Sequence, residues 1–290
     1  MKHLHPTAAL TGALLLLLAT VGLPAQTTPA PVAPAAPAAT ATAPTTTTAP
    51  VANVDRYPNI DSILPVPGTA PWWVQRHAEL VARIKQGNVN LLFVGDSITH
   101  QWEYSFPTEP EHNYLPIWQE FYGDRNAVNL GMKGDETQAV LWRLSNGELE
   151  GISPKAAVVM IGTNNTSRHK DWTPVRTLNG ILADVEYMHR RLPNTKILLL
   201  GIFPSTISPL KSATDETING LLRSVYSGSS YVTFMDIGNV FRKDGAVDGS
   251  LFYEKNGKYQ HPNAAGQRKW AEAIEPTLSQ MLGDKNKLQK

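Results

Sequence analysis

A serine follows an apolar run of this 290-residue chain at a position where it could act as a nucleophile. The run is Leu91–Gly95, and Asp96 and Ser97 come directly after it. Open α/β sheets bind ligands beyond the carboxyl ends of their strands, so we expect Ser97 where chemistry is usually done. A serine at a strand-to-helix junction can also serve only as a helix N-cap. The residues around Ser97 do not match the Gly-x-Ser-x-Gly pattern of a nucleophile elbow.

Two further segments could supply hydrogen-bond donors to a developing oxyanion. Gly134 follows the apolar run at residues 127–130, and Asn164 follows the run at residues 156–161. A glycine lets its backbone N–H approach a ligand closely, and an asparagine amide offers a side-chain N–H. Both residue types are also common in ordinary turns, so each position alone has a purely structural interpretation.

His261 is the histidine best placed to activate Ser97. Among the 8 His of the chain, it alone lies in a loop that Pro262 restrains, directly before the last amphipathic segment. A Ser hydroxyl is a weak nucleophile until a base takes its proton, and the ordinary His pKa of about 6.5 suits that exchange at neutral pH.

Strand-like runs alternate with amphipathic segments along the chain after Asn53. Each run is short and apolar at successive positions, as expected for strands that are buried on both faces of a parallel sheet. The predicted strands are residues 91–95, 127–130, 156–161, 196–202 and 232–237. The predicted helices are residues 72–85, 118–122, 137–144, 175–192, 215–225 and 264–281. This alternation predicts one α/β domain, a three-layer sandwich with a parallel five-stranded sheet.

The first 52 residues differ in composition from the rest. Residues 1–25 combine Lys2 with an apolar run and are typical of a secretory signal peptide, although an uncleaved leader would remain as an anchor. Residues 26–52 are almost only Ala, Pro, Thr and Val and indicate a disordered linker, which either tethers the domain to a surface or has no role. We therefore predict a globular domain at residues 53–290 in a secreted or periplasmic protein, with no stable membrane span after cleavage.

Charge and cysteine content exclude several kinds of function. The chain has 26 Lys and Arg against 25 Asp and Glu, and only Lys2 of these precedes Asn53, so the remainder balances at 25 − 25 = 0. This balance argues against a nucleic-acid partner. The chain has 0 Cys, which excludes a disulfide scaffold, a thiolate zinc site and a catalytic cysteine.

The four segments together resemble the blocks of the SGNH hydrolases, also called the GDSL esterase and lipase family. Gly95-Asp96-Ser97, Gly134, Gly162-Thr163-Asn164 and His261 occur in the family's order. The similarity extends over residues 72–282, and residues 129–165 are similar to the platelet-activating-factor acetylhydrolase branch and its bacterial relatives. The resemblance implies a flavodoxin-like α/β/α sandwich that hydrolyses carboxylic esters with no cofactor and no metal.

The same resemblance implies a role for each matching residue. Ser97 would be the nucleophile, and His261 the general base and then the general acid. The oxyanion donors would be the backbone N–H groups of Ser97 and Gly134 and the side chain of Asn164. Loss of one such donor costs on the order of 100-fold to 1000-fold in rate.

One position departs from the family's pattern. The family has an Asp three residues before its His, where the carboxylate orients the imidazole, and this chain has Lys258 there. Three explanations remain open. The enzyme could use a Ser–His dyad that a backbone carbonyl orients, it could recruit Asp244, Asp248 or Glu254, or it could have lost activity.

The substrate is predicted less specifically than the reaction. His100, Asn165 and Arg168 lie close to the expected site in sequence and are candidate substrate-binding residues. An extracellular domain meets polysaccharides, so we expect a small-molecule or polysaccharide ester, with short acyl groups such as O-acetyl groups on carbohydrate. A lysophospholipase or acetylhydrolase that acts on phospholipid is the alternative within the enzymes, and an acyl-glycan-binding module is the alternative outside them. The sequence predicts no oligomeric state.

Overall fold

The structure is a computed structural model that describes residues 60–289. The predicted signal peptide and linker lie outside the described residues. Within the described part of the chain, no helix has both the length and the apolar character that are needed to cross a bilayer.

The centre of the domain is a five-stranded parallel sheet, as predicted. Its strands follow the order β2-β1-β3-β4-β5. The strands are β1 (Leu91–Gly95), β2 (Ala127–Gly131), β3 (Ala156–Met160), β4 (Lys196–Leu200) and β5 (Val232–Met235). Because all five strands run in the same direction, the segments that follow β1, β2 and β3 meet at one edge of the sheet. The predicted runs at 156–161, 196–202 and 232–237 extend slightly beyond the observed strands.

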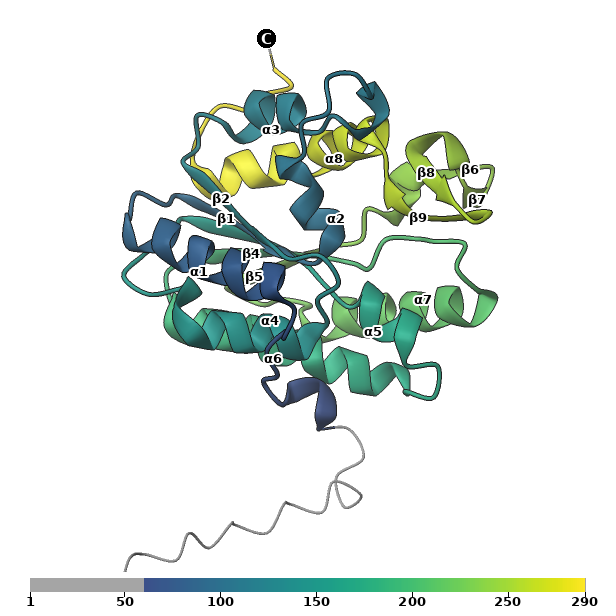
Figure 1. The fold of residues 1–290 in the computed structure, drawn as a ribbon, viewed down its shortest axis with the longest axis horizontal. Coiled ribbons are helices and arrows are strands. Elements are labelled where there is room, and N and C mark those ends of the chain that lie inside the picture. Colours follow the sequence, from purple (N-terminus) through teal and green to yellow (C-terminus); the bar gives the residue numbers. More distant parts are fainter. Residues whose placement is uncertain (1–59, 290) are drawn as a thin grey trace, which may run out of the picture. The chain divides into compact units, whose positions relative to one another are not determined.

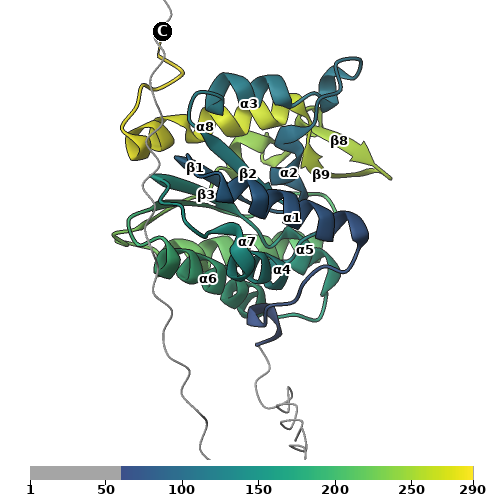
Figure 2. The ribbon, with the colours of Figure 1, turned by 60° about the vertical axis from the view of Figure 1, so that its left-hand side comes forward.

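Helices cover both faces of the sheet and complete the predicted three layers (Figures 1 and 2). One face carries α1 (Pro71–Lys85), α4 (Thr137–Arg143), α6 (Pro174–Arg191) and α7 (Pro209–Val225). The other face carries α2 (Ser97–His100), α3 (Leu115–Tyr122) and α8 (Ala264–Leu282). The short helix α5 (Thr163–Arg168) follows β3.

Alternate side chains of each strand enter different cores. In β1, Leu92 and Val94 pack with the helices of the first face, whereas Leu91 and Phe93 pack with α3 and α8. This division follows from the two-residue period of a strand. The two cores cover opposite faces of the sheet, so the strands that end at the site are packed on both sides.

The structure corrects two of the predicted elements. Helix α7 begins at Pro209 and not near residue 215, because the Ser208 hydroxyl caps it by accepting from Lys211 N and Pro209 occupies the first turn. His261 lies in a strand and not in a loop. Strands β8 (Phe252–Lys255) and β9 (Lys258–Pro262) form an antiparallel hairpin, which the pattern of apolar runs did not predict.

Shorter elements complete the chain. A second small hairpin pairs β6 (Arg242–Lys243) with β7 (Ala246–Val247). The segment Leu144–Glu148 continues α4 as a π-helical turn with a kink, because the backbone angles of Asn146 and Gly147 are not helical. Single 3-10 turns occur at Asp61–Ile63, Gln101–Glu103, Pro110–His112, Gly238–Phe241 and Gly249–Leu251.

Candidate active site

Ser97 is the first residue of α2 and stands directly beyond the carboxyl end of β1. The N-cap of this helix is Asp96, whose carboxylate accepts from Ile98 N at 2.9 Å. Burial raises the pKa of Asp96 to about 7. Since Asp96 does the capping, the Ser97 hydroxyl is available for chemistry, and the interpretation of Ser97 as a mere cap is wrong.

His261 approaches Ser97 from the other end of the chain. Its Nε2 atom lies 2.8 Å from Ser97 Oγ, within hydrogen-bond distance. The Tyr253 ring from β8 stacks on the imidazole, with ring centroids 5.4 Å apart and planes inclined by 16°. The hairpin therefore places a base against the nucleophile and restricts the orientation of its ring.

The surroundings of His261 favour its neutral form. Burial lowers the pKa of the imidazole to about 4, and the positive charges of Lys255 and Lys133 lower it further in the same direction. A neutral imidazole can accept the Ser97 proton without first losing one. His261 is thus in the base form over the whole neutral range.

No carboxylate in the described part of the chain pairs with His261. Asp248 Oδ1 accepts from the amide and hydroxyl of Ser250, and Glu254 Oε1 accepts from Gly257 N at 3.0 Å. Asp244 lies in the exposed turn between β6 and β7. The geometry therefore favours a Ser–His pair without an acid over recruitment of one of these three carboxylates.

Gly134 lies in the turn after β2 and has a φ of +83°, a left-handed conformation that favours glycine. Its carbonyl accepts from Arg168 Nη1 at 2.8 Å. His100 Nδ1 accepts from Lys133 N at 3.2 Å, and burial together with nearby cations lowers the pKa of His100 to about 3. The neutral imidazole of His100 holds the N–H of Lys133, and the guanidinium of Arg168 holds the carbonyl of Gly134. These two contacts fix the backbone on both sides of the Gly134 N–H.

Asn164 lies at the start of α5, and only 9 % of its surface is exposed. Its amide nitrogen donates to the carbonyl of Asp135 at 2.7 Å. An amide has two N–H groups, so this bond fixes the side chain and leaves a second N–H for a ligand. The pairing also connects the turn after β2 with the helix after β3.

A buried cation joins the nucleophile segment to the turn that holds Gly134. Arg143 is fully buried, donates to the carboxylate of Asp135 at 2.7 Å and also pairs with Glu148. A further N–H of Arg143 reaches the carbonyl of Gly95 at 3.4 Å. Sequence reasoning missed this role, because nothing in a local pattern distinguishes a buried arginine on a short helix from an exposed one.

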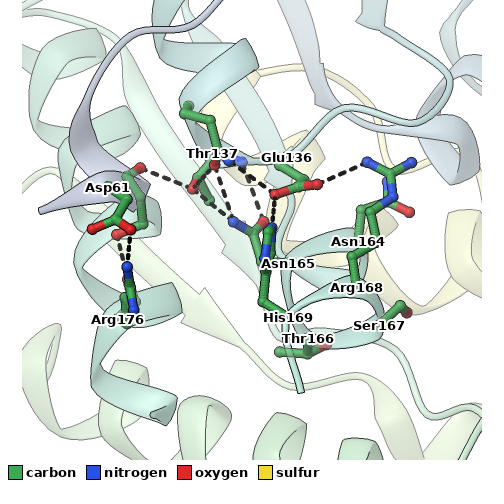
Figure 3. A network of polar contacts seen from close by, with 12 residues as sticks. Asp61, Glu136, Thr137, Asn164, Asn165, Thr166, Ser167, Arg168, His169 and Arg176 are labelled. Carbon is green, nitrogen blue, oxygen red and sulfur yellow. Dashed lines mark hydrogen bonds and ion pairs between the residues drawn. The ribbon is translucent and has the colours of Figure 1, made fainter. Parts of the chain in front are cut away.

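Of the three candidate substrate-binding residues, Asn165 does not reach the surface. Its amide is buried and bonds with Thr137 and Gln138, as Figure 3 shows for Thr137. The prediction that Asn165 binds substrate is wrong, because its polar atoms are used within the fold. His100 and Arg168 lie beside the site, where both form hydrogen bonds with the backbone of the turn around Gly134.

Arg168 is part of a small polar network beside this turn. Its guanidinium donates to Glu136 at 2.8 Å, and Glu136 also lies 2.7 Å from His169 Nε2 (Figure 3). These contacts hold the exposed Arg168 side chain over Gly134.

A groove of about 500 Å³ opens beside Gly134. Its walls include Trp72, Val66 and Ala139 as apolar residues and Lys133 and Arg168 as cations. Trp73 is a buried packing residue that donates to Asp135, whereas Trp72 is 46 % exposed. The groove could therefore hold the part of a substrate that adjoins the reacting group.

The fold and these side chains define a class of protein. They place a serine–histidine pair, with Gly134 and Asn164 as potential oxyanion donors beside it, at the carboxyl edge of a parallel sheet, which is the arrangement of a serine hydrolase. The model of the GDSL-like lipase/acylhydrolase family matches residues 93–269, and this chain belongs to that family. It is a carboxylic ester hydrolase.

One relative is similar in sequence, and two solved structures are similar in fold. The chain is 32 % identical to the bovine platelet-activating factor acetylhydrolase IB subunit alpha1 over 216 residues, which cover 72 % of this chain and 84 % of that protein. A carbohydrate acetylesterase family member from Sinorhizobium meliloti has a similar structure, with a TM-score of 0.51, 17 % identity and coverage of 67 % and 99 % of the two chains. A Geobacillus acetyl-xylooligosaccharide esterase aligns with a TM-score of 0.51 at 19 % identity, covering 69 % and 96 %.

Proposed function

We propose that this chain is a secreted serine esterase that removes short acyl groups, such as O-acetyl groups, from carbohydrate. The observation that carries the proposal is the 2.8 Å contact between Ser97 Oγ and His261 Nε2, beside Gly134 and Asn164. This arrangement contains a nucleophile, a base and donors for an oxyanion, which are the parts that acyl transfer requires.

In the proposed reaction, Ser97 Oγ attacks the ester carbonyl carbon while its proton passes to His261 Nε2. The carbonyl oxygen becomes an oxyanion, which accepts from the backbone N–H groups of Ser97 and Gly134 and from the free N–H of Asn164. Collapse of this intermediate breaks the bond to the alcohol, which leaves with the proton from His261. Water then attacks the carbonyl carbon of the acyl-enzyme while His261 Nε2 takes its proton. The bond to Ser97 Oγ breaks, the carboxylic acid leaves, and His261 returns the proton to Ser97.

The reaction proceeds without a carboxylate behind the histidine. A triad that lacks its acid retains part of its rate, because the oxyanion donors and the base remain. We infer that the stacked Tyr253 ring restricts the orientation of the imidazole, in place of the backbone carbonyl that the dyad hypothesis named. The intact Ser97–His261 contact argues against a non-catalytic binding module.

Three observations support a carbohydrate substrate. The names of two structural relatives state that they are a carbohydrate acetylesterase family member and an acetyl-xylooligosaccharide esterase. The groove beside Gly134 offers the exposed Trp72 ring, and an aromatic ring of this kind can cover the apolar face of a sugar. The composition of residues 1–52 favours secretion, and a secreted enzyme encounters polysaccharides outside the cytoplasm.

A phospholipid substrate is the second candidate. It is favoured by the relative at 32 % identity, whose name states that it is an acetylhydrolase of platelet-activating factor. The two substrates differ in the alcohol that leaves. Comparing acetylated xylan fragments with an acetylated glycerophospholipid at equal concentrations would distinguish them.

The test of the proposal is Ser97→Ala. Hydrolysis of p-nitrophenyl acetate, including the burst of p-nitrophenol from acylation, should disappear. The free energy of unfolding of the variant should lie within about 1 kcal/mol of the wild-type value, because Asp96 and not Ser97 caps α2. A variant with wild-type turnover would show that another residue is the nucleophile.

A further inference from the structure

A second pocket includes His261 in its lining and shares no lining residue with the groove at Gly134. It has a volume of about 320 Å³. We call it the hairpin pocket, since it is lined by Tyr253, Lys255, Asn256, Lys258, Gln260 and His261 of the β8–β9 hairpin, together with Ile207. A group that binds there lies directly beside the proposed catalytic base.

The two lysines of the hairpin pocket are held close together by the strand register. Lys255 and Lys258 are partners across the hairpin, and Asn256 and Gly257 form the tight turn between them with φ values of +54° and +70°. Like charges directly opposite each other in a strand pair are destabilising. Neither side chain pairs with a carboxylate anywhere in the described residues, so the fold retains two uncompensated cations there.

A third cation reaches the site from another segment. Lys133 precedes Gly134, its backbone is held by His100, and its exposed side chain also makes no ion pair within residues 60–289. Lys133 and Lys255 act on the same imidazole, since both disfavour the protonated form of His261. The active site therefore carries unbalanced positive charge, although the chain after Asn53 is neutral in sum.

None of the nearby acids forms an ion pair with these lysines. Glu254 accepts from the backbone of Gly257 in the same hairpin, and Asp248 is used by Ser250. Glu136 is already paired with Arg168 and His169. The three lysines therefore remain available to an anionic group from outside the chain.

We propose that the hairpin pocket binds an anionic group of the substrate, held by Lys255 and Lys258 beside the scissile ester. This inference rests on the proposed esterase function and narrows its substrate to esters that carry a carboxylate or a phosphate, such as an acetylated acidic sugar. The bound anion also lies where it offsets the lysines around His261. It thus stabilises the imidazolium that forms when Ser97 gives up its proton, the task that the carboxylate of a triad performs.

The experiment compares two esters of equal shape and different charge. Values of kcat/KM are measured for 3-acetoxybenzoate and for 3-acetoxybenzamide, each divided by its uncatalysed hydrolysis rate. The wild type should prefer the anion about tenfold at low ionic strength, as expected for two cations near one charge, and the preference should fall as salt is added. A third ester, 3-acetoxyphenyl phosphate, shows whether a phosphate group raises the normalised kcat/KM more than a carboxylate does.

Lysine variants locate the preference in the hairpin pocket. Lys255→Gln and Lys258→Gln should each lower the anion-to-neutral ratio about threefold, and the double variant should bring it close to one. Lys196→Gln is the matched control, because this exposed lysine begins β4 at the opposite edge of the sheet. The melting temperature should not fall in Lys255→Gln or Lys258→Gln, since each variant removes a like-charge repulsion between the two strands.

Lys258→Asp gives the sharpest result. The new carboxylate should orient His261 and raise hydrolysis of the neutral ester by up to about tenfold, while it repels the anionic ester, so the ratio should fall below one. An equal rate on both esters in the wild type, or an equal change on both in Lys258→Asp, would overturn the anion pocket. Absence of hydrolysis of every ester by the wild type would instead overturn the proposed esterase function.

Discussion

At the scale of single residues, two neighbouring asparagines have different roles. Asn164 is a candidate for catalysis, whereas Asn165 stabilises the fold. Asn164 gives one N–H to Asp135 and has the second free, whereas the Asn165 amide is used within the fold. Asn164→Ala should lower kcat by about 100-fold to 1000-fold and leave KM nearly unchanged, because an oxyanion donor acts in the transition state. Steady-state kinetics on p-nitrophenyl acetate measures both constants.

Asn165→Ala is the matched control for this prediction. It removes the same amide one residue further along, so it should lower the thermal stability without a selective loss of kcat. If Asn164→Ala instead raises KM with kcat intact, Asn164 is a residue of ground-state binding and not an oxyanion donor.

The lowered pKa of His261 predicts an unusual pH profile. The base must be neutral to act, and its pKa is lowered to about 4 by burial and by Lys255 and Lys133. The acid limb of kcat/KM should therefore lie near pH 4, and activity should persist at pH 5 to 6, where a His with an ordinary pKa of about 6.5 is mostly protonated.

The profile is measured on a neutral ester at constant ionic strength, with circular dichroism at each pH to exclude unfolding. Lys255→Gln should move the acid limb upward, since it removes a cation that disfavours the imidazolium. A limb near pH 6.5 in the wild type would contradict the buried, cation-flanked environment of the base.

At the scale of elements, the buried Arg143 on α4 holds two loops of the site together. It bonds with Asp135 beyond β2 and with the Gly95 carbonyl at the end of β1. Arg143→Met should destabilise the domain by about 3–5 kcal/mol, because it leaves Asp135 and Glu148 buried without their cation. Urea unfolding followed by circular dichroism measures this loss.

Arg190→Met provides the comparison for Arg143→Met. Arg190 and Glu186 form an exposed ion pair within α6, with a separation of 3.5 Å, and such pairs contribute about 0–1 kcal/mol. A loss of stability in Arg143→Met as small as in Arg190→Met would show that the buried cluster does not hold the two loops.

At the scale of the whole molecule, we expect residues 53–290 to act without the segment before them. Both hydrophobic cores and every side chain of the proposed site lie within residues 60–289. A chain that begins at Asn53 should keep the melting temperature of the longer chain within about 2 °C and its kcat/KM on p-nitrophenyl acetate within about twofold. A larger loss in either measurement would show that residues 1–52 contribute to the fold or to the site.

Local patterns were enough to predict most of the elements. Four consecutive apolar residues before Gly95 predicted β1 with its observed bounds, because a strand buried on both faces needs apolar residues at every position. The start of α7 was missed because its first two turns show little apolar periodicity, and only the Ser208 cap and Pro209 mark its beginning. The hairpin was missed because its strands are half exposed and carry few apolar residues.

The sequence by itself determined the sheet, the order of the four blocks and the identity of Ser97, Gly134, Asn164 and His261 as candidates. Those features are local, since each depends on a few neighbouring residues and on the direction of a strand. Only the tertiary structure decided that Ser97 meets His261, 164 positions away, that Asn165 is buried, and that Lys255 and Lys258 face the base without a carboxylate. Contacts between distant segments depend on how the layers pack, and no periodicity along the chain records that packing.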